Sequence, residues 1–161
     1  MKRSTLFLLA ALLAALLGAP AVAQVTSHDQ PIHDAARTGS ANDVSRLLKA
    51  DHKQRDVRTA LGSTPLHLAA MNGDIGVMKA LIAAGADPNA RDNDGATPLH
   101  MAAYASRPKH VQMLLEAGAD PLAKTDNGRD AGSMARKVKA DETAGVLSLW
   151  ILKGCKAGKP C

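Results

Sequence analysis

Two histidines occupy the same place in two copies of a seven-residue phrase. Residues 64–70 read TPLHLAA and residues 97–103 read TPLHMAA. An imidazole three residues after a hydroxyl could be half of a catalytic pair or of a metal site. Such a site also needs an acid, a nucleophile or a further ligand at a matching interval, and neither phrase carries one nearby. The repetition therefore predicts a structural role for Thr64, His67, Thr97 and His100.

The other histidines do not form a metal-binding pattern either. No two of His28, His33, His52 and His110 have the i, i+4 spacing of a helical pair, and no cysteine lies at zinc-finger spacing. His28 and His33 could contact a metal, but we interpret them as part of a mobile polar leader. We expect no metal site and no cofactor.

The first 23 residues have the features of a cleaved export signal. Lys2 and Arg3 precede an apolar run over residues 6–17, and the segment ends in small residues at Ala23. The alternative, an uncleaved membrane anchor, is less favoured because a bilayer span needs about 20 apolar residues. The Ala-rich run and the small-residue cleavage site resemble bacterial signals. We expect cleavage after Ala23, a leader over residues 24–30, a periplasmic location and no membrane contact after cleavage.

Composition limits the classes of fold and partner. The chain has 161 residues, of which 46% are hydrophobic and 2% aromatic, so its core must be built from small and aliphatic side chains. This favours closely packed helices. The net charge of +5 includes Lys2 and Arg3, which leave with the signal. With so few aromatic residues for base stacking, we expect no nucleic-acid partner.

A period of 33 residues organises the rest of the chain. Gly62, Gly95 and Gly128 stand in phase, and AGADP at residues 84–88 returns at residues 117–121. A period of 33 with the phrase T-P-L-H-x-A resembles the ankyrin-repeat family. The resemblance implies an all-α solenoid of about four helix-turn-helix repeats with projecting loops. The expected units are residues 31–61 as a degenerate N-terminal cap, 62–94 and 95–127 as repeats, 128–152 as a degenerate C-terminal cap, and 153–161 as a tail.

Local signals agree with that division. Thr64 and Thr97 are suited to cap a helix, and the prolines after them suit a first helical position. Core-spaced apolar residues follow and end near Gly85 and Gly118. The Asp- and Asn-rich residues 87–94 and 120–127 are predicted to be projecting loops.

Ankyrin-repeat proteins bind other proteins through a concave surface, so the resemblance implies a non-catalytic binding module. It also implies that His67 and His100 bond the neighbouring threonine and the adjoining loop. We find no nucleophile elbow, no phosphate-binding glycine loop and no HExxH motif, and we expect no enzyme activity. Small exported members of the family are associated with stress tolerance or, alternatively, with inhibition of a toxic enzyme. We expect a protein partner and a monomer when the partner is absent.

The family's concave surface is formed by the ends of the first helices and by the loop tips. Met71 and Tyr104 are the expected apolar anchors, although Tyr104 could instead simply cover a neighbouring helix. Matched to this chain, the partner-binding positions are Arg37, Thr38, Met71, Asn72, Asn93, Asp94, Tyr104, Ala105, Asp126, Asn127 and Arg129.

The two cysteines lie close together in the tail. An exported chain meets an oxidising compartment, and an even number of cysteines favours an intramolecular disulfide. Cys155 and Cys161 are therefore expected to pair. A redox-active or metal-binding pair is the less favoured alternative, because the spacing is not that of Cys-x-x-Cys.

Overall fold

The computed structural model describes residues 29–156 and residue 159, and these form a stack of short helices. The predicted all-α repeat solenoid is confirmed. The described part contains eight α-helices and one short 3-10 helix, in the order α2 (Pro31–Thr38), α3 (Ala41–Ala50), η1 (His52–Asp56), α4 (Pro65–Ala69), α5 (Ile75–Ala83), α6 (Pro98–Tyr104), α7 (Pro108–Glu116), α8 (Ala131–Lys137) and α9 (Asp141–Leu152).

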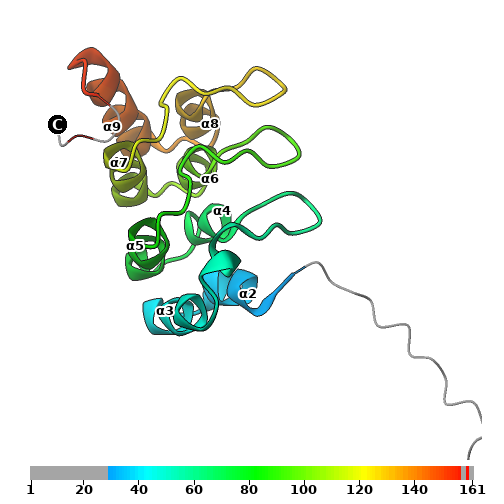
Figure 1. Ribbon diagram of the computed structural model, residues 1–161. Coiled ribbons are helices and arrows are strands. Elements are labelled where there is room, and N and C mark those ends of the chain that lie inside the picture. Colours follow the sequence, from blue (N-terminus) through cyan, green and yellow to red (C-terminus); the bar gives the residue numbers. More distant parts are fainter. Residues whose placement is uncertain (1–28, 157–158, 160–161) are drawn as a thin grey trace, which may run out of the picture.

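The helices are arranged in two parallel rows. Figure 1 shows the first helices α2, α4, α6 and α8 in one row and the second helices α3, α5, α7 and α9 in the other. The loops that join successive helix pairs extend beyond the first row, all in the same direction (Figure 1). The predicted projecting loops are therefore present, and the first helices lie between them and the second helices.

Proline marks the start of several helices. Pro31, Pro65, Pro98 and Pro108 all lie at the beginning of a helix. Proline fits this position because the N–H that it lacks has no intrahelical acceptor there. The helix starts are thus set locally, while stacking on neighbouring units supplies the stability that helices this short lack alone.

Small and aliphatic side chains fill the interior, as the composition predicted. Ala36, Ala69, Ala102 and Ala135 are fully buried, one from each helix of the first row. Fully burying a leucine contributes about 2 kcal/mol. Leu66, Leu81, Leu99, Leu114 and Leu115 are each 0% exposed.

Several sequence-based expectations fall on residues that the structure does not describe. The export signal, the cleavage point and His28 lie outside the described residues, and so does Cys161. Cys155 is partly buried and packs against the core, but its pairing with Cys161 stays a prediction. No helix in the described ranges is long and apolar enough to cross a membrane.

Candidate functional site

His67 joins its own helix to the next loop. Its Nδ1 accepts the backbone N–H of Thr64 at 3.1 Å and lies 2.9 Å from the Thr64 hydroxyl oxygen. On the other side of the ring, Nε2 lies 3.1 Å from the carbonyl oxygen of Ala96. His100 repeats the arrangement with Thr97 and with the carbonyl of Arg129, at the same distances.

These contacts fix which nitrogen carries the proton. A backbone N–H can only donate, so Nδ1 of His67 must be the acceptor and Nε2 must be protonated and donate to Ala96. Burial lowers the pKa of His67, which outweighs the opposite effect of the Ala96 carbonyl. Burial lowers the pKa of His100 in the same way. Both rings are therefore neutral parts of the framework, with no free nitrogen to offer a substrate.

His33 performs the same task, and our interpretation of it as part of a mobile leader is wrong. It lies on α2 and is 0% exposed. Its Nδ1 accepts the backbone N–H of Gln30 at 2.8 Å, and Nε2 lies 3.2 Å from the carbonyl oxygen of Val57. Sequence reasoning missed this role because Gln30 replaces the threonine and the interval to the next phrase is one residue longer. The shared Pro-x-His pattern was the available signal.

Asn72 is also structural, which corrects its assignment to the partner-binding surface. It is 8% exposed. Its Nδ2 donates to the carbonyl oxygens of Ala36 and Gly39, and its Oδ1 accepts the N–H of Asp74. Both the amide nitrogen and the amide oxygen make hydrogen bonds within the protein, and those of the nitrogen join the first two helix pairs, so the side chain is not available to a partner.

The predicted apolar anchors are exposed on the first row of helices. Met71 follows α4 and is 38% exposed, and Tyr104 ends α6 and is 56% exposed. Arg37 on α2 and Lys137 on α8 hold the corresponding positions, and both are exposed. We call Arg37, Met71, Tyr104 and Lys137 the first-helix row. Lys137 was missed by sequence reasoning because the last unit departs from the phrase.

Three other predicted residues gather around a hollow between the last two loops. Asp94, Asn127 and Arg129 line a cavity of about 210 Å³. Met101 of α6 and Met134 of α8 also line it, and sequence reasoning missed both. Methionine adapts its shape to an incoming side chain. The lining of the hollow thus combines two methionine side chains with polar groups.

Of the remaining predicted residues, three are exposed and hydrogen-bonded within the protein, and one is half-buried. Asn93 donates to the carbonyl oxygen of Ala60 at 3.1 Å, and Asp126 accepts from Arg91 at 3.3 Å. The hydroxyl of Thr38 donates to the carbonyl oxygen of its own helix at Asp34. Ala105 is half-buried at the end of α6. The loops therefore hold one another in place.

The described ranges contain no group of three or more His, Cys, Asp or Glu residues that could hold a metal ion. The buried histidines and the first-helix row are separate features. The histidines hold the repeats together, whereas the first-helix row presents side chains to solvent.

Comparison with known proteins agrees with the geometry. A family model described as ankyrin repeats in three copies matches residues 11–125, which is more than half of the chain. A mitochondrial disaggregase of Bos taurus is 41% identical to this chain over 68 residues. The matched segment makes up 42% of this chain and 10% of that protein.

Two further relatives match over segments of similar length. Ankyrin repeat and SOCS box protein 3 of Bos taurus is 39% identical over 62 residues, which is 37% of this chain and 12% of that protein. A putative ankyrin repeat protein of Fowlpox virus is 35% identical over 66 residues, which is 41% of this chain and 16% of that protein. The chain thus covers only a small part of each of these relatives.

Proposed function

Because the chain belongs to the ankyrin-repeat family, we propose that it is a non-catalytic module that binds a protein partner along its first helices and loops. Ankyrin repeats are interaction modules and are generally non-catalytic. In this chain, the histidines that could have served a reaction are neutral and hydrogen-bonded on both ring nitrogens.

The exposure of the first-helix row supports this proposal. Met71 and Tyr104 present large apolar surface at the same position of successive units. Leu66 in α4 and Leu99 in α6 are by contrast fully buried. Aromatic residues, methionine and arginine are enriched where protein interfaces carry their binding energy. The hollow lined by Met101 and Met134 involves the same helix, α6, that ends at Tyr104, and it could receive one apolar side chain of the partner.

Photo-cross-linking tests where the partner binds. A benzoyl-phenylalanine introduced at Tyr104 should form a specific adduct in extract from the compartment where the protein acts. The same group at Gln112, an exposed position on the second helix α7, serves as the control. Adducts from position 112 but none from position 104 would move the interface to the second helices.

A double variant separates binding from folding. Met71→Ala with Tyr104→Ala should keep its helical circular dichroism and its unfolding free energy within about 1 kcal/mol of the parent, since both side chains are exposed. It should lose most of the captured partner. Unchanged capture by this folded variant would contradict the docking surface.

We also propose that the protein acts in the periplasm after loss of residues 1–23. The basic start, the apolar run and the small residues before Gln24 support this. Intact-mass measurement of the protein recovered from the periplasm should give a chain that begins at Gln24. The tail cysteines should resist alkylation until they are reduced. A mass that retains the first 23 residues would contradict the export proposal.

A further inference from the structure

The hollow between the last two loops contains a cation that the protein itself does not pair. Each arginine between residues 29 and 94 donates to a carboxylate or to a backbone carbonyl; these are Arg37, Arg46, Arg55, Arg58 and Arg91. Arg129 lines the hollow and is exposed, and among the described residues its guanidinium makes no hydrogen bond or ion pair. The Asp126 carboxylate lies 3.3 Å from Arg91 instead. That of Asp130 lies 4.0 Å from Arg136. Arg129 is therefore available to a carboxylate from outside the chain.

A second cation stands on the exposed side of α8. Lys137 ends this helix, is exposed, and makes no ion pair within the part of the chain that the structure describes. It follows Met134 by three residues, so the two side chains share one face of the helix. Met134 lines the hollow. The rise of an α-helix places Arg129 and Lys137 about 12 Å apart along α8. The two cations thus lie on either side of Met134.

Between the cations, the hollow offers apolar contacts. Met101 of α6 lines it together with Met134, and Ala96 adds a third apolar side chain. The volume of about 210 Å³ is large enough for one side chain, and methionine sulfur makes favourable contacts with aromatic rings. Asp94 supplies the only carboxylate in this lining. The surface therefore has an apolar centre with an unpaired cation toward each end of α8.

We propose that the partner binds here through an acidic segment, in which an aromatic side chain enters the hollow and flanking carboxylates contact Arg129 and Lys137. This inference rests on the proposed function and specifies the chemistry of the partner. Residues four apart in an extended chain are separated by about 13 Å, which matches the separation of the two cations. Hydrogen bonds from a guanidinium or an ammonium to a carboxylate are charge-assisted. The order acid, aromatic, acid therefore fits the order of groups along α8.

Methionine methyl signals in an NMR titration report directly on the hollow. The probe is the peptide acetyl-Asp-Gly-Phe-Gly-Asp-amide, added to the isotope-labelled protein at low ionic strength. The signals of Met101 and Met134 should shift and saturate, whereas that of Met78, which is 0% exposed in α5, should not. Peptides with lysine in place of both aspartates, or alanine in place of phenylalanine, should bind at least about tenfold more weakly. Absence of saturable shifts, or equal affinity for the lysine peptide, would overturn the proposal.

Charge-neutralising variants identify the cations that the peptide contacts. Arg129→Gln and Lys137→Gln should each weaken binding about threefold, and the double variant about tenfold, because exposed ion pairs contribute modestly and add when they are separate. The fold should be preserved, since His100 bonds only the backbone carbonyl of Arg129. Unchanged affinity in the double variant would contradict the proposed contacts.

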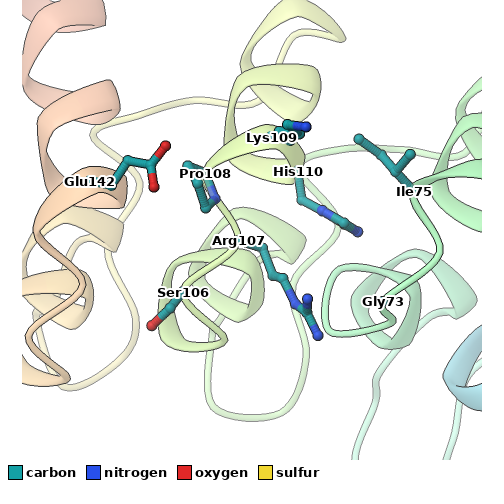
Figure 2. Close-up of a pocket in the computed structure, with 8 residues that line it drawn as sticks. All are labelled: Gly73, Ile75, Ser106, Arg107, Pro108, Lys109, His110 and Glu142. Atoms are coloured by element: carbon teal, nitrogen blue, oxygen red, sulfur yellow. The ribbon is translucent and has the colours of Figure 1, made fainter.

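A second basic cavity provides the matched control. It has a volume of about 400 Å³ and lies at the start of α7, where Arg107 and Lys109 line it (Figure 2), and no methionine is among its lining residues. Lys109→Gln removes the same charge as Lys137→Gln from an exposed position. It should leave the affinity within about twofold, since exposed distant charges are screened. An equal loss in this variant would reduce the effect to one of net charge and would refute the site.

Asp94→Asn should have the opposite effect. It copies Asn127, which holds the same place one unit later, and it removes the carboxylate that lines the hollow. The acidic peptide should then bind about twofold more tightly, because a like charge is removed. Weaker binding would mean that Asp94 itself contacts the ligand and that the segment is not acidic.

The cross-linking experiment at Tyr104 separates this inference from the proposed function. A partner adduct at that position without any binding of the acidic peptide would reject the acidic segment and leave the proposed function intact. Absence of both the adduct and the methionine shifts would contradict both.

Discussion

The buried histidines function as neutral groups, and this makes the fold sensitive to acid. Protonation of Nδ1 in His67 would remove the acceptor of the Thr64 N–H while leaving that N–H buried. A buried donor without an acceptor costs about 1 to 3 kcal/mol. His100 has the same arrangement with Thr97. The two interfaces that His67 and His100 join therefore each contain a group that must stay neutral for the interface to remain intact.

We predict that the free energy of unfolding falls as the pH is lowered from about 7.5 to 5. The unfolded histidines take up protons near pH 6.5, whereas burial lowers the pKa of His67 and His100 in the folded state. The unfolded state thus binds more protons in this range, so stability is retained above about pH 6.5 and lost below it. The slope is at most about 1.4 kcal/mol per pH unit for each histidine.

Urea unfolding of His67→Ala over this pH range tests the mechanism. The variant should lose about 1 to 2 kcal/mol at pH 7.5 through its missing hydrogen bonds and should show a shallower pH dependence than the parent. Asp43 and Asp130 also have lowered pKa values, through hydrogen bonds from Ser40 and Ser133. Their effects come at lower pH, below about 4. Identical slopes in parent and variant would contradict the role of His67.

Sequence alone identified the individual roles where the phrase was intact. Thr64 and His67 were recognised because residue types and spacing both recur. His33 and Asn72 were not, since each role depends on the residue that lies opposite in space. The carbonyls that Asn72 binds lie 36 and 33 residues away.

At the scale of elements, successive loops are joined to one another by backbone hydrogen bonds. The N–H of Asn93 donates to the carbonyl of Leu61, and Asp126 repeats the bond one loop later with Asp94. Gly95 has φ +71°, and a Cβ there would collide with the Asp126 carboxylate. The positive φ explains why glycine recurs at a fixed place in the period, because Gly62 and Gly128 share it. The contact with the next loop applies to Gly95 and not to Gly128, whose Cβ would meet no other atom.

The sequence predicts where each helix starts better than it predicts which group caps that start. Proline and threonine placed α4 and α6 correctly because these signals act within one turn. The start of α7 carries a proline, but Arg107 before it makes no side-chain cap hydrogen bond. The fourth unit uses Asp130 instead of threonine, with its carboxylate accepting the N–H of Ser133. In this fourth unit, Ser133 occupies the position of the histidine in the other units.

At the scale of the whole molecule, each unit contacts its neighbours, so stability should be lost locally. Helix pairs that touch are adjacent in the stack, such as α3 with α5 and α7 with α9. In such an array, the stability is close to a sum of unit and interface contributions. A substitution that weakens one interface should therefore unfold the units between that interface and the nearer end of the stack before it affects the other units.

Asn72→Ala tests this at the first interface. The substitution leaves the carbonyls of Ala36 and Gly39 without their donor and should cost about 1 to 3 kcal/mol. Hydrogen exchange followed by mass spectrometry should show lost protection in α2 and α3, with α7 and α9 unchanged. Asn93→Ala is the matched control, because it also removes a bond between units, at 3.1 Å to Ala60.

Asn93 is exposed, so water can replace its amide and the control should cost less than about 0.5 kcal/mol. Burial, rather than the mere presence of a bond between units, would then explain the difference between the two asparagines. Equal loss of protection in all helices after Asn72→Ala would mean that the stack opens as one cooperative body. Equal effects of the two substitutions would show instead that the buried amide of Asn72 does not hold the first unit in place.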